Sequence, residues 1–315
     1  MFETPVLFMI YNRPDVTIKV FSEIRKIKPK FLFVAADGPA SDDPKEVNNC
    51  NICRKFVMDN IDWECEIKTL FRDKNLGCKL SVSSAIDWFF DEVNQGIILE
   101  DDCLPSKSFF YFCESLLKKY EHRDDILVIS GNNFNKKKVG EADYYFSKIP
   151  QIWGWATWKR VWRELDLEMA TYKDEIVRRS FSNKKVQNYW IDTFNLYKNR
   201  RIDTWDYSLT FLVFSKNGLC VCPNKNLVSN IGFGINSTNT LFSYNIEKIL
   251  SIKEEINLPL KHPYKIEYNF DNDRGVLKYL LRFYGIKNFL KKIYLFNFVK
   301  KVVIFIYTIK KSFYE

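Results

Sequence analysis

The chain has 315 residues, enough for one large or two medium domains with a substantial buried core. It is 46% hydrophobic and 17% aromatic, a composition that excludes a disordered protein. The net charge is +9, but residues 276–315 contribute +8 of it, with nine basic residues and one acid. By difference, the first 275 residues carry +1. The basic charge is therefore a property of the C-terminal segment, and we expect no nucleic-acid partner.

The N-terminal segment lacks the features of a signal peptide, and no apolar run approaches the roughly 18 residues needed to span a bilayer. We therefore expect a cytoplasmic protein with reduced cysteines. Cys50 and Cys53 form a C-x-x-C pair and Cys220 and Cys222 are one residue apart, but no second pair at zinc-finger spacing accompanies either, which favours ordinary thiols. With only two histidines in the chain, catalysis is expected to rest on carboxylates.

Short apolar runs alternate with amphipathic segments in the first half. The apolar runs predict strands over 6–11, 31–36, 66–71, 96–99 and 126–130. Helical spacing predicts helices over 15–27, 44–60, 77–92 and 107–120, the last with Ser106 as its N-cap, and later over 183–198 and 204–216. This alternation predicts an α/β fold, a mostly parallel sheet with helices on both faces. Ligands of such sheets bind beyond the carboxyl ends of the strands.

Three adjacent acids, Glu100, Asp101 and Asp102, follow the predicted strand over 96–99. Strand alternation directs Glu100 and Asp102 to one side and Asp101 to the other. Adjacent carboxylates repel one another unless they are solvated or neutralised by a cation, and oxygen ligands suit Mg²⁺ or Mn²⁺. The segment thus predicts either a metal site or a solvated acidic turn. A nicotinamide-binding or methyl-transfer domain would need Gly-x-Gly after the first strand. This chain has Arg13-Pro14 there, which argues against both classes of domain.

The segment 99–110 reads Leu-Glu-Asp-Asp-Cys-Leu-Pro-Ser-Lys-Ser-Phe-Phe. It resembles the metal-binding motif of GT-A glycosyltransferases, in the Glu-Asp-Asp form of the inverting N-acetylglucosaminyltransferase I type. The Asn-Arg at 12–13, the Ala-Ala-Asp-Gly-Pro at 35–39 and the Arg-Asp-x-Asn-x-Gly at 72–77 resemble that fold in the same order, and the likeness covers residues 4–135. Segments 152–158, 203–206 and 226–234 resemble bacterial sugar-transferase relatives through less specific motifs.

The resemblance implies a GT-A, Rossmann-like fold and roles for seven residues. Asp102 would be the direct ligand of Mn²⁺ or Mg²⁺. The other implied donor-binding residues are Glu100 and Asp101 at the ribose and donor sugar, Arg13 and Asp37 at the nucleoside, and Arg72 and Lys79 at the diphosphate. Without the motif context, a solvated surface charge is the favoured interpretation of each basic residue. The implied donor is a nucleotide-diphosphate sugar, with a UDP-sugar expected.

Inverting transfer needs a carboxylate that takes the proton of the acceptor hydroxyl. Asp206, where a helix is expected to begin, is the candidate, and Asp203 is second; either could instead simply cap that helix. The tryptophans at 153–158 could form a platform for the acceptor sugar or could pack in the core. The spacing of Trp153, Trp155 and Trp158 predicts a loop-to-helix transition at position 154 rather than one helical face.

The chain is expected to divide into a catalytic domain over 1–262 and a basic amphipathic, helical tail over 263–315. Within the domain, 1–135 forms the nucleotide-sugar-binding half and 136–262 the acceptor half. Apolar residues with paired lysines predict a tail that lies on the anionic inner face of the plasma membrane, or else a helix docked on the domain. The expected function is sugar transfer to a polysaccharide or lipid-linked oligosaccharide. The alternatives are a nucleotidyltransferase on a similar sheet and a membrane-active or scaffold protein that acts through its tail.

Overall fold

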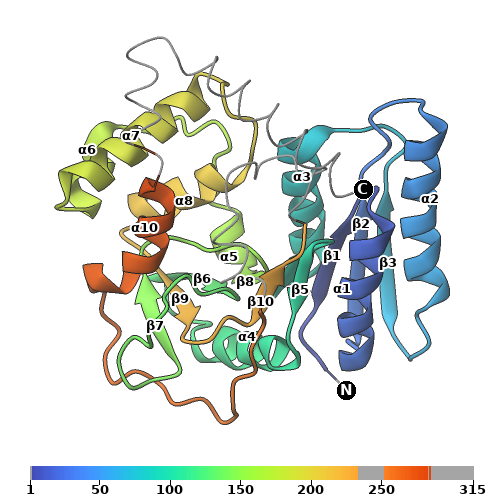
Figure 1. The fold of residues 1–315 in the computed structure, drawn as a ribbon, viewed down its shortest axis with the longest axis horizontal. Coiled ribbons are helices and arrows are strands. Elements are labelled where there is room, and N and C mark those ends of the chain that lie inside the picture. Colours follow the sequence, from blue (N-terminus) through green and yellow to red (C-terminus); the bar gives the residue numbers. More distant parts are fainter. Residues whose placement is uncertain (1, 233–251, 283, 285–315) are drawn as a thin grey trace, which may run out of the picture. The chain divides into compact units, whose positions relative to one another are not determined.

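The five apolar runs of the first half all become strands of one sheet in the computed structural model, which describes residues 2–232, 252–282 and 284 (Figure 1). Among these residues the sheet has eight strands in the order β3-β2-β1-β4-β8-β6-β9-β7, and a two-stranded sheet pairs β10 with β5. Strands β3, β2, β1 and β4 are parallel to one another, as are β6 and β9, while β8 and β7 run antiparallel to their neighbours. The fold is thus an α/β fold with a mixed, mostly parallel sheet.

The elements agree closely with the periodicity of the sequence. The strands are β1 (Val6–Ile10), β2 (Phe31–Ala36), β3 (Glu66–Phe71), β4 (Gln95–Glu100), β5 (Cys103–Pro105), β6 (Ile126–Ser130), β7 (Tyr144–Ser147), β8 (Trp155–Trp158), β9 (Leu219–Pro223) and β10 (Val228–Asn230). The helices are α1 (Pro14–Ile27), α2 (Pro44–Asp59), α3 (Gly77–Glu92), α4 (Lys107–Lys119), α5 (Lys159–Trp162), α6 (Asp174–Ser180), α7 (Lys184–Lys198), α8 (Asp206–Ser215), the 3-10 helix η1 (Phe270–Asp273) and α10 (Arg274–Leu281). Each helix and strand predicted in the first half is therefore confirmed within two residues at either end.

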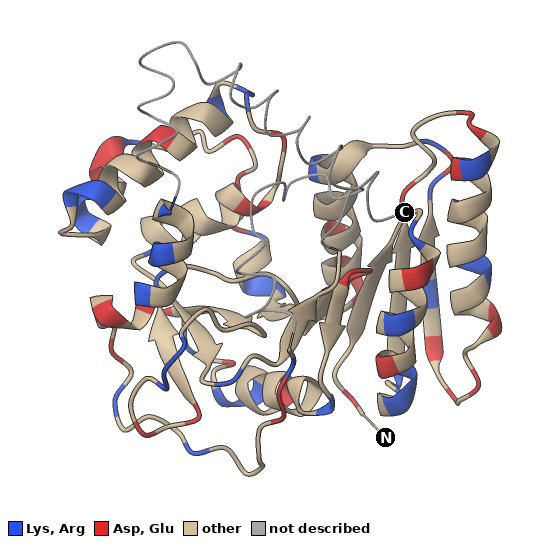
Figure 2. Cartoon of the chain, in the orientation of Figure 1, with Lys and Arg blue, Asp and Glu red and all other residues tan. Residues whose placement is uncertain are grey.

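Helices cover both faces of the sheet. Phe8 of β1 contacts Phe21 of α1, with ring centroids 6.3 Å apart, whereas Phe33 of β2 contacts Phe89 of α3 at 4.9 Å. Phe8 pairs in register with Val34, so the neighbouring Phe33 points to the opposite face. All residues of β1 are buried, as expected for a strand covered on both sides, and the charged residues gather on the helices and loops (Figure 2).

The order of the strands creates a switch point between β1 and β4. The chain runs outward from β1 to β2 and β3, and then returns to the other side of β1 as β4. The connections after β1 and β4 therefore lead to strands on opposite sides of this pair, and ligands of open α/β sheets bind beyond the carboxyl ends of the strands at such a point. This is the edge of the sheet at which the acids of the Glu100–Asp102 segment lie.

Two helices are capped from elsewhere in the chain. Asp37, at the end of β2, accepts a hydrogen bond from the amide of Leu76 at the start of α3. Ser106 is the N-cap residue of α4, as predicted, but its side chain makes no capping bond. Instead the Glu255 carboxylate accepts from the amides of Lys107 and Ser108 at 3.0 and 2.8 Å, which also favours the helix dipole.

Residues 155–158 form strand β8. The prediction that a helix follows the loop at position 154 is therefore wrong. Gly154 has a φ of +67°, which suits glycine, and the chain then enters the sheet between β4 and β6 before α5 begins at Lys159. A four-residue strand with neighbours on both sides is fixed by pairing partners far away in the sequence, which the local spacing of the tryptophans does not reveal.

The chain divides into two compact units, Met1–Val276 and Leu277–Glu315. In the first unit, η1 packs against β7, and Gly275 donates its amide to the Asn135 side chain at 2.8 Å. The predicted boundaries at 135 and 262 stay predictions. Most of the predicted tail lies outside the described residues. The described part of the second unit includes the end of α10. Among the described residues, none of the helices combines the length and the apolar character that a bilayer crossing requires.

Candidate active site

Arg13 and two acids meet at the switch point. Arg13 follows β1, and Asp101 and Asp102 follow β4, so the parallel pairing of these strands brings together side chains 88 and 89 positions apart. The guanidinium donates Nε to Oδ2 of Asp101 at 3.3 Å, Nη1 to Oδ2 of Asp102 at 3.1 Å, and Nη2 to Oδ1 of Asp101. Arg13, predicted at the nucleoside, is thus the cation that holds the acidic segment.

The two aspartates differ in their availability. Asp101 is 3% exposed, and Arg13 donates to both of its oxygens. The side chain of Asp102 is 16% exposed and shares only Oδ2 with Arg13; its Oδ1 lies 3.5 Å from the Cys103 sulfur. Asp102 is therefore the acid better able to reach a ligand. The contact of Asp101 with ribose or sugar stays a prediction.

The acids carry more negative charge than Arg13 compensates. Burial raises the pKa of Glu100 to about 8, and the charges of Asp102 and Asp101 add to this. Burial likewise raises the pKa of Asp101 to about 6, although Arg13 opposes the shift. Burial disfavours the charge on Arg13 itself, but the two aspartates outweigh it and raise the pKa of the guanidinium. Three carboxylates with one guanidinium form a site that favours a further cation.

Asp206 is the first residue of α8, at the position where the sequence predicts a helix to begin. The hydroxyl of Thr204 donates to its Oδ1, and burial raises the pKa of its carboxyl group. The charge of Asp206 is also among those that raise the pKa of Glu100, so the two carboxylates lie within electrostatic range of each other. The structure therefore brings Asp206 to the acidic segment from the opposite half of the chain.

Cys78, in the first turn of α3, lies within electrostatic range of acids from both halves of the chain. The thiol reaches solvent, yet the surrounding protein raises its pKa to about 12, and Glu100, Asp206, Asp203 and Asp102 add to the shift in that order. A single thiol within range of all four carboxylates indicates that they surround one region. Asp203, the second candidate for the base, shares this region and is more exposed than Asp206.

Asp37 is committed to the backbone. Its Oδ1 accepts from the amides of Gly38 and Leu76, each at 3.0 Å, and its Oδ2 lies 3.1 Å from the Leu76 nitrogen. The carboxylate is 8% exposed and fixes the connection between β3 and α3. Its predicted contact with the nucleoside stays a prediction, and the structure adds a role in shaping this edge of the sheet.

Arg72 and Arg54 lie together at the ends of β2 and β3. Arg72 donates Nη2 to Ser84 at 2.8 Å, its Nη1 is buried without a partner among the described residues, and burial lowers its pKa. Arg54 of α2, which the sequence did not single out, donates Nη2 to the backbone oxygens of Asp37 and Arg72 at 3.0 and 2.5 Å. A helical arginine among polar neighbours looks like a surface charge, so only the fold reveals this bridge between two strand ends.

Lys79 links α3 to the second half of the chain. Its Nζ lies 3.3 Å from Oε1 of Glu168 and 4.7 Å from the centroid of the Tyr197 ring in α7. The side chain is 18% exposed, and these contacts raise its pKa against the effect of burial. A contact with a diphosphate stays a prediction for Lys79, which in this structure joins two helices.

Two of the three platform tryptophans belong to the core. Trp155 is 1% exposed and stacks on Trp205, with centroids 5.5 Å apart, and Trp158 is 2% exposed and donates Nε1 to Leu117 at 3.3 Å. Rings buried in this way cannot stack on an acceptor, which corrects the predicted platform for Trp155 and Trp158. Trp153 is partly exposed and packs at 5.6 Å from Phe134, so it remains the candidate.

Gly232 is a further residue that the sequence did not identify. The amide of the preceding Ile231 donates to the backbone oxygen of Asp102 at 2.8 Å, so the chain after β10 passes directly over the acidic segment. A Cβ at position 232 would lie 2.1 Å from Oδ2 of Asp102 and 2.7 Å from its Cβ. Only glycine permits this approach to the carboxylate.

No three or more His, Cys, Asp or Glu side chains form a ready-made metal site within the part of the chain that the structure describes. The chemistry of the acidic segment nonetheless fits a divalent cation. Mg²⁺ is often held by one or two carboxylates together with substrate phosphates. Asp102 offers a partly exposed carboxylate, and Glu100 lies close enough to it to supply a second carboxyl group.

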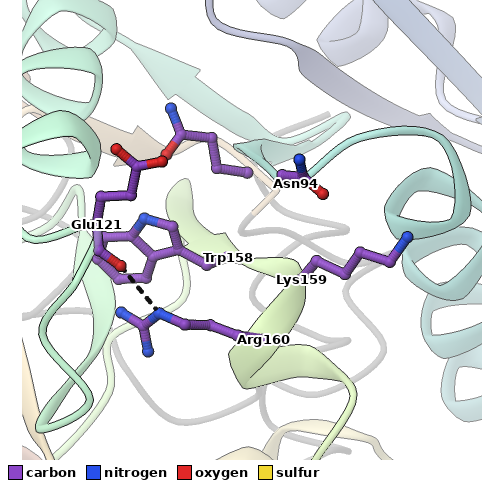
Figure 3. A pocket seen from close by; sticks show the side chains of 6 residues that line it. Asn94, Glu121, Trp158, Lys159 and Arg160 are labelled. Carbon is purple, nitrogen blue, oxygen red and sulfur yellow. Dashed lines mark hydrogen bonds between the residues drawn. The ribbon is translucent and has the colours of Figure 1, made fainter.

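A hollow at the other end of β4 is separate from these acids. It is lined by residues at the start of β4 and around α5, namely Asn94, Gln95, Glu121, Trp158, Lys159 and Arg160 (Figure 3). Arg160 donates to the backbone oxygens of Glu121, Arg123 and Ile126 at 3.2, 2.9 and 3.2 Å, so its guanidinium closes the turn after α4. Its charge is thus engaged by the fold.

No family model matches the chain, and no curated protein matches its sequence. Solved structures show distant likenesses. A mannosyltransferase from Pyrobaculum calidifontis in complex with GDP-Man and Mn²⁺ is 10% identical, with 69% of this chain and 70% of that one covered and a TM-score of 0.40. A UDP-glucose pyrophosphorylase complexed with UDP-glucose is 10% identical, with 70% of this chain and 90% of that one covered and a TM-score of 0.37. The glycosyltransferase GlyE of Streptococcus pneumoniae TIGR4 is 10% identical, with 70% of this chain and 45% of that one covered and a TM-score of 0.34. Likenesses this distant assign no activity, so function must be argued from the site.

Proposed function

We propose that the chain is a metal-dependent glycosyltransferase that moves a sugar, with inversion, from a nucleotide-diphosphate sugar to a glycan or lipid-linked acceptor. The observation that carries this proposal is the meeting of Arg13, Asp101 and Asp102 at the switch point, with Glu100 and Asp206 in electrostatic range. Crevices at such points are where open α/β sheets bind nucleotides. A surplus of carboxylates there is suited to a divalent cation and the phosphates that accompany it.

Asp102, with Glu100 beside it, would hold Mn²⁺ or Mg²⁺. When bound, the ion would supply compensation for the negative charge of a departing diphosphate. Arg13 keeps Asp101 ionised and so fixes the backbone on which Asp102 stands. Arg72 and Lys79, each on the connection between β3 and α3 or just beyond it, are the chain's own candidates for further phosphate contacts.

Asp206 would take the proton of the acceptor hydroxyl as that oxygen attacks the anomeric carbon. Burial raises its pKa, and a carboxylate with a raised pKa is a stronger base than one in water. The Thr204 hydroxyl donates to Oδ1 and so orients the carboxylate. Trp153, which is partly exposed, would contact the acceptor.

Binding of nucleotide sugars is the first test. We expect one donor among UDP-, GDP- and CDP-sugars, with a UDP-sugar foremost, to raise the melting temperature with Mn²⁺ and much less with EDTA, because a ligand of the folded state stabilises it by mass action. Transfer to a lipid-linked or glycan acceptor should then release the nucleoside diphosphate. Release of pyrophosphate from a nucleoside triphosphate and a sugar 1-phosphate would identify a nucleotidyltransferase instead. Binding of none of these ligands would overturn both functions.

We also propose that the segment after α10 holds the enzyme at the anionic inner face of the plasma membrane. The support is the charge of residues 283–315, where seven basic residues and one acid give +6, since each basic residue near an anionic surface contributes on the order of 1 kcal/mol. Removing residues 283–315 should abolish co-sedimentation with anionic vesicles and leave donor binding intact. A truncated protein that aggregates but still binds vesicles would support a docked helix.

A further inference from the structure

One carboxylate on α2 gathers the loops at the nucleotide side of the sheet. Oε1 of Glu46 accepts from the Tyr11 hydroxyl, from Nδ2 of Asn12 at 3.3 Å and from the amide of Ala40 at 3.1 Å, and its Oε2 accepts from the Ser41 hydroxyl at 2.7 Å. The hydrogen bond from Tyr11, followed by the other donors, lowers the pKa of Glu46 to about 2. The side chain therefore remains an ionised acceptor at every pH at which the protein is expected to work.

This arrangement differs from the local role that the sequence suggests for Glu46. Asp43 is the N-cap of α2 and Glu46 stands three residues later, a spacing typical of a capping box in which the glutamate would bond the N-cap amide. The amide of Asp43 instead lies 3.4 Å from the Ser41 hydroxyl. The Glu46 carboxylate points to residues of two other loops, so helix capping does not account for it.

The loop after β1 connects Glu46 to the acidic segment. The Tyr11 hydroxyl donates to Glu46, and Arg13, two residues later in the same loop, holds Asp101 through both oxygens. The loop after β1 thus contacts α2 through Tyr11 and the carboxylates after β4 through Arg13.

The loop after β2 is fixed from its other side as well. The backbone oxygen of Gly38 accepts from Nδ2 of Asn75 at 2.8 Å, and a Cβ on Gly38 would lie 2.4 Å from the backbone of Lys74. Glu46 then holds Ala40 and Ser41, so the connection between β2 and α2 is held at both ends. Glu46 is the junction at which this loop joins the residues that follow β1.

We infer that Glu46 is a positioning residue for donor binding, which sets the loops after β1 and β2 in the geometry that a nucleotide requires. The inference rests on the proposed function, because a donor nucleotide would bind beyond the strand ends that these loops border. Loops ordered before binding do not lose conformational freedom when the ligand arrives, and the gain appears as affinity. Glu46 touches no reacting atom and should therefore affect the binding of the donor far more than the chemical step.

The test compares Glu46→Ala and Glu46→Gln with Asp59→Ala, which removes an exposed carboxylate paired with Lys55 on the same helix. In Glu46→Ala we expect amide exchange over 11–13 and 38–41 to quicken, and the donor Kd and KM to rise about 10-fold with kcat nearly unchanged, as for other outer-shell partners. Glu46→Gln should recover most of the affinity, because its amide oxygen can accept as Oε1 does and its NH₂ can donate to the Ser41 hydroxyl. Asp59→Ala should behave as the wild type.

Unchanged exchange in both loops of Glu46→Ala would overturn the anchoring, and quicker exchange with an unchanged donor Kd would overturn its role in binding. An equal fall of kcat in both Glu46 variants would mark a catalytic or purely structural residue instead. If the wild-type chain binds no nucleotide sugar, the proposed function fails and the donor role of Glu46 falls with it. The exchange measurement, made without ligand, still reports separately whether Glu46 holds the loops.

Discussion

Asp101 and Asp273 are both almost completely removed from solvent, at 3% and 0% exposure, but only Asp101 is paired with a cation. Arg13 engages both oxygens of Asp101 at the carboxyl edge of the sheet. Asp273, in η1, accepts from the Ser147 hydroxyl at 2.5 Å and from the amide of Lys148 at 3.3 Å. Burial raises the pKa of both carboxyl groups, to about 6 and about 7.

The difference teaches how burial and charge are divided in this fold. At the switch point, a fixed guanidinium keeps carboxylates ionised where strands end and a ligand can enter. Beside β7, hydroxyl and amide donors bind the Asp273 carboxyl group, which takes up a proton near neutral pH. The first arrangement is suited to binding cations and phosphates, and the second to fastening one segment of the chain to another.

The sharpest way to break this comparison is Asp102→Asn. The change removes the partly exposed charge of the acidic segment, so metal-dependent donor binding should be lost and kcat/KM should fall on the order of 10³-fold, the scale of losing one strong electrostatic contact in a transition state. The control is Asp124→Asn, an exposed aspartate in the turn after α4. Calorimetric titration of donor with Mn²⁺, and the melting curve, check both variants. An unchanged Mn²⁺ dependence in Asp102→Asn would falsify the site.

Asp206→Asn should separate binding from chemistry. Donor binding should persist, because Arg13 and the acidic segment are intact, while kcat should fall by about 10²-fold, the usual range for removing a general base. Single-turnover transfer with a bound donor measures this directly. Asp203→Asn is the companion variant. A loss of kcat confined to Asp203→Asn would move the base to Asp203. An equal loss of donor binding in the Asp206 and Asp203 variants would remove Asp206 from that role.

Gly232→Ala tests the close approach of the backbone to Asp102. The new methyl group would meet Oδ2 at 2.1 Å, so either the carboxylate or the strand β10 must move. We expect Mn²⁺ affinity and kcat/KM to fall about 10-fold, since small displacements in a reacting site are costly. Gly218→Ala is the matched control for packing. Its new methyl group would lie 2.5 Å from the side chain of Leu127, which is not part of the acidic segment. Equal effects on Mn²⁺ affinity in the two variants would show that Gly232 has no special place.

Asp273→Asn should have the smallest effect on activity, because it acts on stability alone. The carboxyl group binds its proton up to about pH 7 in the folded state and only up to about pH 4 when unfolded, so unfolding free energy should decrease as pH rises from 4 to 7. The total change for this group is about 4 kcal/mol. Urea unfolding between pH 5 and 8 should show a flatter profile in the variant, which should also be the more stable protein at pH 8. An identical slope in the two proteins would contradict the assignment.

Much of the fold could be predicted because its information is local. Apolar runs and helical spacing placed the elements of the first half, and the position of Glu100, Asp101 and Asp102 after a buried strand located the acidic edge. Arg13 was found as a residue at the end of β1, although its partner proved to be the acids. In these cases the signal lies within one strand and the residues that follow it.

What could not be predicted depends on partners distant in the chain. Strand β8 is defined by pairing with β4 and β6, and that pairing decided that Trp155 and Trp158 lie in the core. Glu46 acts on Tyr11, 35 residues away, from a helix position that reads as an ordinary capping residue. Arg54 and Gly232 likewise acquire their roles only when separate loops meet.

The place of β6 limits how this chain can be divided or recombined. β6 precedes residue 135, but its neighbours in the sheet are β8 and β9, which both come later. A fragment ending at 135 would leave the edge of β4 and both edges of β6 without partners, and open strand edges favour aggregation. The first 135 residues cannot be expressed or exchanged as a module by cutting there. A chimaera with a different segment after residue 135 must supply its own counterparts of β8 and β9, so the properties of such a protein would have to change by replacing loops and helices around an undivided sheet.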